Sequence, residues 1–300
     1  MRWDDFRRSE NVEDRRGSGG GFGVPGRAGG IGIGTVIVLG LLGWALGIDP
    51  RILIGGAEVL TGGGPGYQAP SPQPRAPTGA PADQLGQFVA AVLGDTEDRW
   101  KAIFQASGRR YEEPRLVIFS QVTRSQCGTA QAAMGPFYCP LDRTVYLDTS
   151  FFRELEQRFG GCSGKACQFA QAYVIAHEIG HHVQNLLGIL PKVQELQQQS
   201  MDRREANQIQ VRVELQADCL AGVWAHQAQQ KWNFIEPGDV EAAMQTASAI
   251  GDDKLQKRSQ GHVVPDAFTH GSSEQRVRWF TKGLKEGSVS GCNTFDAAQI

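Results

Sequence analysis

The chain has 300 residues and a formal net charge of −2, and 40% of its residues are hydrophobic. This apolar content is enough for a packed core, whereas the near-neutral charge lacks the basic excess with which nucleic-acid-binding proteins neutralise phosphates. Of the 38 glycines and 14 prolines, 20 and 8 fall within the first 82 positions. We therefore expect a boundary near residue 82, followed by one sizeable folded domain.

Residues 1–30 are polar, rich in glycine and dense in charge of both signs. They show neither the helical nor the alternating apolar period of an element that buries one face. A segment that cannot bury apolar surface stays disordered, so we expect residues 1–30 to form a disordered tail.

An uncharged apolar run, IGIGTVIVLGLLGWALGI, extends from residue 31 to residue 48. At about 1.5 Å per residue, a helix of this length reaches roughly 27 Å, just enough to cross a hydrocarbon core. About thirty residues precede the run, unlike the short leader of a secretory signal peptide. We predict one transmembrane anchor over residues 31–54, with a buried core helix as the alternative.

Basic residues predict the orientation of this anchor. Six arginines precede the apolar run, whereas only Arg51 and Arg75 occur in the next fifty residues. Because basic residues stay preferentially in the cytoplasm, the N-terminus is expected there and the rest of the chain outside. Residues 55–82 are rich in glycine and proline, which is typical of a linker that holds a domain off the bilayer.

The folded domain is expected to span residues 83–300. An amphipathic helical pattern covers residues 84–105, and two stretches of β-branched and aromatic residues predict strands at 115–122 and 144–150. Helical patterns dominate the remainder. The sequence predicts an α+β fold that is mainly helical with a small β-sheet; the further helices expected are 150–158, 168–187, a stretch from 192, 203–231, 237–250 and 272–284.

The stretch Ala-His-Glu-Ile-Gly-His at residues 176–181 carries the strongest chemical signal. On a helix, His177 and His181 project from one face and can hold one metal ion. Glu178 is the carboxylate that activates a metal-bound water in zinc proteases with the H-E-x-x-H motif. The motif therefore predicts a Zn²⁺ site, with two core or surface histidines as the alternative.

A catalytic zinc ion takes three protein ligands and keeps one position for water. Gln184 and Leu187 exclude the form of the motif with a third histidine directly downstream. Glu214 is the best remaining candidate, because its neighbours in Val-Glu-Leu-Gln-Ala-Asp-Cys-Leu-Ala-Gly are apolar or small. Asp218, one turn later, can accept the free N–H of a ligating histidine. An exchange of these two roles and an exposed acidic helix face are the alternatives.

Six cysteines, an even number, lie in the region placed outside the cell, where disulfides persist. Six cysteines allow fifteen connectivities, and proximity in the chain favours three pairs. Buried free thiols are the alternative. The expected pairs are Cys127–Cys139, Cys162–Cys167 and Cys219–Cys292.

Several motifs together carry a resemblance to a known family: HEIGHH, ELQADCLAG, THGSSEQR at 269–276, GPFYCP at 135–140 and the N-terminal MRW. With them, the chain resembles the bacterial membrane-anchored neutral zinc metallopeptidases over nearly its whole length. It is more distantly similar to the prenyl-protein endopeptidases, which share H-E-x-x-H followed by an E-x-x-x-D helix. Because those proteins span the membrane several times and this chain is expected to span it once, their substrates are not expected here.

The resemblance implies a zincin-like fold in which Glu214, rather than Asp218, binds zinc. It also implies that His270 lies near the metal. In a bacterial host the expected location is the plasma (inner) membrane, with the N-terminus in the cytoplasm and the zinc domain in the periplasm or outside the cell.

These assignments together predict a membrane-anchored zinc endopeptidase that acts on a peptide or protein substrate. Glu178 would serve as general base, and His270 would donate to the developing oxyanion, unless it only caps a helix. By analogy with zincins, the strand at 144–147 would be the sheet edge that pairs with substrate. The alternatives are a non-proteolytic zinc-binding scaffold or chaperone-like protein, and hydrolysis of a different amide such as a cell-wall peptide. Of the other histidines, His182 is expected to be structural.

Overall fold

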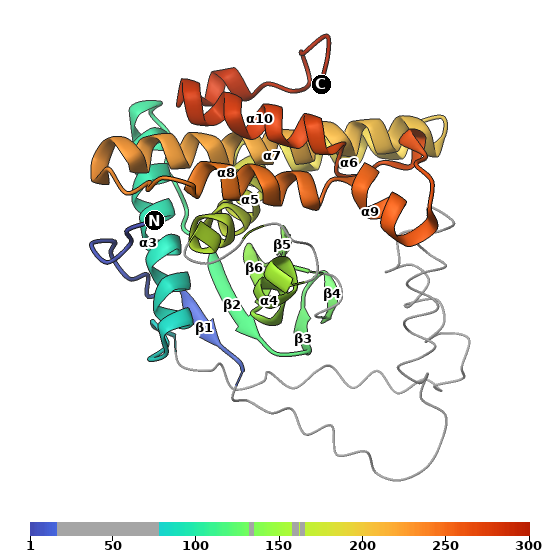
Figure 1. Cartoon of the computed structure of the whole chain (residues 1–300). Helices are drawn as coiled ribbons and strands as arrows, with labels where there is room; N and C mark the ends of the chain where they lie inside the picture. The colour runs from blue at the N-terminus through green and yellow to red at the C-terminus, as the bar shows by residue number, and fades with distance from the viewer. Residues whose placement is uncertain (17–77, 132–134, 158–161, 163–165) are drawn as a thin grey trace, which may run out of the picture. The chain divides into compact units, whose positions relative to one another are not determined.

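The computed structural model describes residues 1–16, 78–131, 135–157, 162 and 166–300 (Figure 1). Its longest helix, α7 (Arg203–Trp232), packs against α5 (Cys167–Leu186) on one side and α10 (Ser273–Glu286) on another. The predicted mainly helical α+β fold is confirmed. The remaining helices are α3 (Gln84–Ala106), α4 (Ser150–Gln157), α6 (Ile189–Gln199), α8 (Asp239–Ala249), α9 (Asp252–Gln260) and the short 3-10 turns η3 (Pro265–Ala267) and η4 (Val289–Cys292).

Polar side chains begin the helices that carry the domain. The Asp83 carboxylate accepts the Gly86 N–H at the start of α3, and Asp202 accepts the Glu205 N–H at the start of α7. Ser272 and Gln275 form a reciprocal capping box at the start of α10. Each cap satisfies a backbone N–H that has no partner within the helix, which places the helix starts close to the predicted positions.

A four-stranded sheet lies beside these helices, in the order β1 (Val12–Asp14), β2 (Arg115–Phe119), β6 (Thr144–Asp148) and β5 (Phe137–Cys139). The first three strands are parallel, and β5 is antiparallel to β6. A separate hairpin joins β3 (Val122–Ser125) and β4 (Gly128–Gln131). The prediction that residues 144–147 form a sheet edge is wrong, because β6 is hydrogen-bonded on both sides; the edges are β1 and β5.

The N-terminal residues 1–16 belong to the folded domain. Their strand β1 pairs in parallel with β2, with Val12 opposite Leu116. The ring of Phe6 lies 5.4 Å from that of Phe234 and 5.9 Å from that of Trp232 at the end of α7. Burial of these apolar side chains supplies a favourable hydrophobic contribution. The buried hydrophobic residues of the segment are Met1, Trp3, Phe6 and Val12.

Polar contacts hold the same segment on α3. The buried carboxylate of Glu97 accepts hydrogen bonds from the Ser9 hydroxyl at 2.6 Å and from the Asn11 amide at 2.8 Å. The Arg7 guanidinium pairs with Glu97 at 2.7 Å and with Asp98 at 3.0 Å. The predicted disordered tail is therefore wrong for residues 1–16. The partners lie about eighty or more positions away, so no local pattern reveals them.

The predicted anchor at 31–54 and most of the predicted linker at 55–82 lie outside the described residues. Within the part that the structure describes, no helix is both long and apolar enough to cross a membrane. Residues 1–16 and the chain from 78 onward fold into one unit. A single crossing between them would separate β1 from β2, so the predicted topology with the N-terminus and the domain on opposite sides is wrong.

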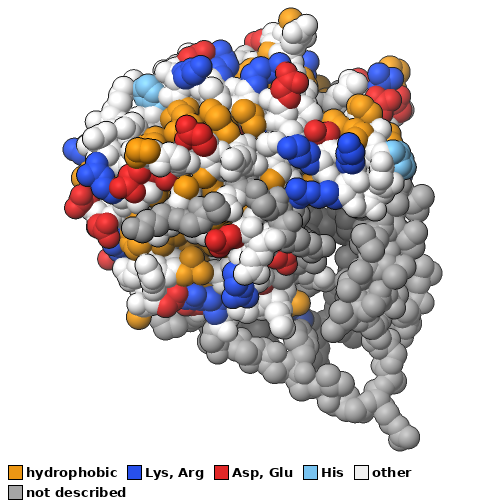
Figure 2. All heavy atoms as spheres, viewed as in Figure 1, with side chains coloured by type: hydrophobic (Ala, Val, Ile, Leu, Met, Phe, Trp, Pro, Cys, Tyr) orange, Lys and Arg blue, Asp and Glu red, His pale blue; other side chains and the backbone are white. Residues whose placement is uncertain are grey.

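The three expected disulfides are present: Cys127–Cys139, Cys162–Cys167 and Cys219–Cys292. They indicate an oxidising compartment, such as the periplasm or the cell exterior. On the face shown in Figure 2, basic and acidic side chains are interspersed with hydrophobic ones. That face therefore presents no large patch of a single charge.

The shared core predicts that both ends of the chain lie on the same side of any membrane. We expect the exposed positions Glu10 and Lys285, each replaced by cysteine in an otherwise unchanged chain, to react at similar rates with a membrane-impermeant maleimide applied to intact cells or spheroplasts. The native cysteines are paired in disulfides and provide the unreactive background. Labelling of only one of the two positions would contradict the shared core.

Candidate metal centre

The candidate site forms where α5 crosses α7. A Cβ atom on Gly180 would lie only 2.9 Å from the Ala217 carbonyl oxygen, so the two helix backbones approach as closely as glycine permits. His177 and His181 lie one turn apart on α5, on either side of Gly180 in the sequence. Since Glu214 occupies the matching face of α7, the crossing brings the three predicted ligands together.

Their donor atoms converge on one point. The Nε2 atoms of His177 and His181 lie 3.2 Å and 3.4 Å from the same Glu214 carboxylate oxygen. All three ligand atoms fall within 4.8 Å of one another. Zinc bonds to nitrogen and oxygen are about 2.0–2.2 Å long, so two ligands at the tetrahedral angle stand about 3.3 Å apart. The two nitrogen–oxygen distances therefore match the spacing between ligands of a tetrahedral zinc ion.

His177 lies between two carboxylates. Its Nδ1 is 2.8 Å from Asp218, while its Nε2 faces Glu214. If Nδ1–H donates to Asp218, Nε2 faces a carboxylate, and either a second proton or a metal ion must lie between them. Both Asp218 oxygens already have other donors: Arg276 donates to each at 2.9 Å, and the Tyr173 hydroxyl donates to one at 2.6 Å. Asp218 thus faces Nδ1, away from the point where the Nε2 atoms meet Glu214.

The pKa shifts of the cluster point the same way. Burial alone would raise the pKa of Asp218, but Arg276 and His177 lower it to about 2. Burial would likewise raise the pKa of Glu214, yet the charges of neighbouring histidines hold it well below its usual range. Burial would lower the pKa of His181, but Glu214 raises it to about 9. The site keeps its carboxylates ionised and favours positive charge between them.

Glu178 and His270 flank this cluster. Glu178 is 7% exposed, and its carboxylate makes no hydrogen bond within the described part of the chain. His270 lies on the loop before α10, with its side chain half exposed, and its charge lowers the pKa of Glu214. The charge of Glu178 likewise raises the pKa of His181, so both side chains act electrostatically on the candidate ligands.

Asp252 fixes the loop that carries His270. One oxygen of its buried carboxylate accepts the backbone N–H groups of Thr269, His270 and Gly271 at 2.7, 2.6 and 3.1 Å. Its other oxygen lies 3.5 Å from His270 Nδ1. The same carboxylate thus sets the backbone of the loop, whereas Nδ1 of the imidazole lies nearer to the Thr269 hydroxyl, at 3.0 Å.

Sequence reasoning missed several of these partners. Arg276 lies within the quoted THGSSEQR motif but had no role assigned, and Asp252 lies outside every motif. Gln210 donates to the second Glu214 oxygen at 2.9 Å, and Gln184 contacts His181 Nδ1 at 2.8 Å. A spacing of three or four residues from a ligand on the same helix was the signal that could have found both glutamines.

Two other histidines make structural contacts. His182 is buried, with Nδ1 2.9 Å from the Tyr138 hydroxyl and Nε2 2.6 Å from the Glu112 carbonyl oxygen, and its expected structural role is confirmed. His226 contacts the Leu284 carbonyl oxygen at 2.8 Å.

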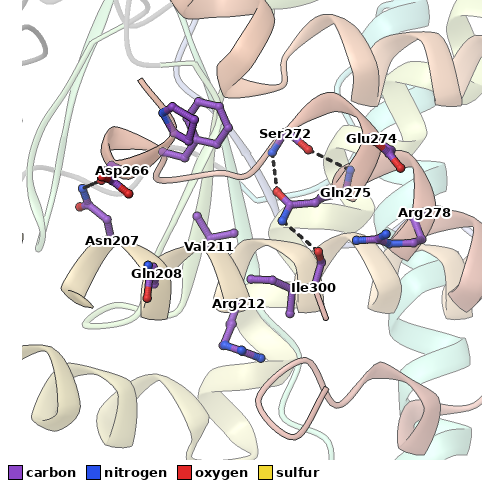
Figure 3. A pocket seen from close by; sticks show the side chains of 12 residues that line it. Asn207, Gln208, Val211, Arg212, Asp266, Ser272, Glu274, Gln275, Arg278 and Ile300 are labelled. Atoms are coloured by element: carbon purple, nitrogen blue, oxygen red, sulfur yellow. Dashed lines mark hydrogen bonds between the residues drawn. The ribbon is translucent and has the colours of Figure 1, made fainter. Parts of the chain in front are cut away.

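A cavity of about 570 Å³ lies along the first half of α7, next to the loop before α10 and the start of α10. Figure 3 shows Val211 and Gln208 of α7 facing Ser272 and Gln275 across it. None of the three candidate ligands lines this cavity. It is therefore a neighbour of the metal centre on α7 rather than part of it.

Comparison with known proteins agrees with this chemistry. Residues 1–295 match the family described as "Putative neutral zinc metallopeptidase". The uncharacterized protein YpfJ of Escherichia coli (strain K12) is 45% identical over 302 residues, covering 98% of this chain and 99% of that protein. The uncharacterized protein Rv2575 of Mycobacterium tuberculosis (strain ATCC 25618 / H37Rv) is 41% identical over 233 residues, covering 74% and 75%. No solved structure matches.

These comparisons bear on neither the membrane anchor nor the similarity to prenyl-protein endopeptidases, which stay predictions. The match over residues 1–295 includes both helices of the metal centre and the N-terminal segment. The chain therefore belongs to the neutral zinc metallopeptidase family.

Proposed function

We propose that this protein is a zinc-dependent endopeptidase that hydrolyses peptide bonds with a zinc-activated water. The observation that carries the proposal is the meeting of two histidine Nε2 atoms and one Glu214 oxygen at 3.2–3.4 Å, beside a glutamate with no hydrogen-bond partner among the described residues. Its proposed partners are a peptide or protein substrate and, through attachment by residues 31–54 with both ends of the chain on the same side, the plasma membrane.

His177, His181 and Glu214 would hold the ion. When bound, zinc lowers the pKa of a water toward about 7 and polarises the scissile carbonyl. Asp218 instead accepts the His177 Nδ1–H and fixes its tautomer, since its oxygens are taken by Arg276 and Tyr173. This arrangement favours Glu214 over Asp218 as the third ligand.

Glu178 would take the proton from the attacking water and pass it to the leaving amine. Its side chain is buried directly after His177 on α5 and makes no hydrogen bond within the part of the chain that the structure describes. A purely structural zinc site has no need of such a group. Glu178 therefore favours hydrolysis over a zinc-binding scaffold.

His270 would donate a hydrogen bond to the oxyanion that develops as the carbonyl is attacked. Asp252 holds the loop through three backbone N–H groups, and Nδ1 of the imidazole lies beside the Thr269 hydroxyl and the Asp252 carboxylate. A donor fixed in advance loses little by reorganisation during the reaction. Because His270 is half exposed, a substrate can reach it.

A substrate strand would pair with β5 rather than β6. Among the strands beside α5, β5 is the sheet edge, and its Tyr138 hydroxyl contacts His182 of α5. An extended peptide can add to such an edge through backbone hydrogen bonds. By this assignment the substrate would pair with the edge strand of the sheet rather than with the internal strand.

Zinc analysis of the full-length protein tests the ligand set with two matched variants. Glu214→Gln and Asp218→Asn each remove one charge and keep the side-chain shape. We expect near-stoichiometric zinc in the wild type and its loss in Glu214→Gln. Asp218→Asn should keep zinc at saturation with an affinity about 10–100-fold weaker. Loss of zinc on changing Asp218 alone would reverse the two roles.

Cleavage of an unstructured protein such as casein tests the activity. We expect Glu178→Gln to bind zinc like the wild type and to cleave about 10²–10⁴-fold more slowly, since only the proton-transfer group is lost. The full chain is required because residues 1–16 belong to the core. Wild-type protein that holds zinc yet cleaves neither proteins nor cell-wall peptides would favour the scaffold alternative.

The role of His270 is tested by His270→Gln. We expect kcat to fall about 10²–10³-fold, the usual effect of removing one oxyanion donor, with KM and zinc content nearly unchanged. Exchange of the exposed His262 for glutamine provides the control. A change in KM alone would place His270 in substrate binding instead.

A further inference from the structure

A buried pair of glutamine amides lies behind His181. Gln184, three residues later on α5, is fully buried, and its Oε1 is 2.8 Å from His181 Nδ1. Its Nε2 donates to the Val213 carbonyl oxygen at 2.8 Å and to Gln216 Oε1 at 3.0 Å. Every polar atom of this side chain therefore has a partner on α5 or α7.

The donor directions in this chain of hydrogen bonds follow from chemistry. A backbone carbonyl only accepts, so the Gln184 amide must present Nε2 to Val213 and Oε1 to His181. An amide oxygen also only accepts, so His181 must carry its proton on Nδ1. The Nε2 lone pair then points toward Glu214 Oε2, 3.4 Å away.

The series of hydrogen bonds ends at the backbone carbonyl oxygen of Cys292, a residue joined to α7 by a disulfide. Gln216, 6% exposed, donates through Nε2 to the Cys292 carbonyl oxygen at 3.1 Å. The Cys292 side chain is bonded to Cys219, three residues after Gln216 on the same helix. The disulfide thus keeps the last acceptor against α7.

We propose that Gln184 and Gln216 are positioning residues that fix the tautomer and ring orientation of His181. The Cys219–Cys292 disulfide holds the last acceptor of this hydrogen-bond series, the Cys292 carbonyl oxygen, in place. The proposal rests on the proposed zinc site. The two histidines are then oriented differently, because His177 donates to a carboxylate paired with an arginine, whereas His181 donates to a neutral amide. The His181 arrangement adds no further buried charge.

The test measures zinc affinity of the full-length protein by competition with a chromophoric chelator. Gln184→Leu should raise the zinc dissociation constant about 10–100-fold, the usual effect of losing the partner of a ligating histidine. Gln216→Leu should raise it less, because Gln184 keeps its bond to Val213. Gln256→Leu is the matched control: Gln256 is also buried, accepts the Val264 N–H and contacts no ligand.

Cobalt substitution gives a second measurement. The d–d absorption of the Co²⁺ protein reports ligand geometry, and we expect it to change in Gln184→Leu and to stay as in the wild type in Gln256→Leu. Combining Gln216→Leu with Cys219→Ala and Cys292→Ala should lower the zinc affinity no more than Gln216→Leu alone. Both changes break the same series of hydrogen bonds, so their effects should not add.

A dissociation constant within twofold of the wild type in Gln184→Leu, with a loss of thermal stability like that of Gln256→Leu, would overturn the proposal and leave Gln184 a packing residue. That result leaves the zinc site itself standing. A wild-type chain that binds no zinc would instead overturn the proposed function, and this inference with it.

Discussion

The close contact of α5 and α7 at Gly180 and Ala217 is the constraint on which the metal centre depends. At this crossing the side chains on either side of Gly180 meet those on either side of Ala217, so two histidines face Glu214 and Asp218. Any side chain at position 180 would meet the α7 backbone at 2.9 Å. A motif of six residues becomes a metal site only because the helix packing supplies its third ligand.

A buried charge pair extends this constraint to a third helix. Asp218 and Arg276 join α7 to α10, and the Tyr173 hydroxyl joins both to α5. Removing one partner of such a pair typically costs about 3–5 kcal/mol, since the other charge stays buried. A Cβ on Gly283 would overlap the Cys219 carbonyl oxygen, so the backbones of α10 and α7 are also in direct contact. The orientation of His177 is thereby coupled to the helix that follows the His270 loop.

Sequence reasoning reached those features that depend on local spacing. The histidine pair, the acid in an apolar helix, the helix ranges and the Cys162–Cys167 disulfide all leave a pattern within a few residues. The N-terminal segment leaves none, because β1 is three residues long and its partners Glu97 and Leu116 lie far along the chain. The strand β5 is equally short, so β6 passed for an edge. Gln184 was considered only because it occupies the glycine position of the longer motif, although its amide contacts His181.

The candidate ligands and His270 are held by different elements of the fold. All three candidate ligands lie on helices. The helix α7 is held at two places: the Cys219–Cys292 disulfide fixes its middle, and Phe6 packs on Trp232 at its end. Ligands on helices keep their geometry better than ligands on loops. His270 alone lies on a loop, and that loop is fixed by a single carboxylate, Asp252. In the proposed reaction the metal ligands would keep their places on the helices and Asp252 would hold the oxyanion donor on its loop, so binding of the ion and contact with the peptide would depend on different elements.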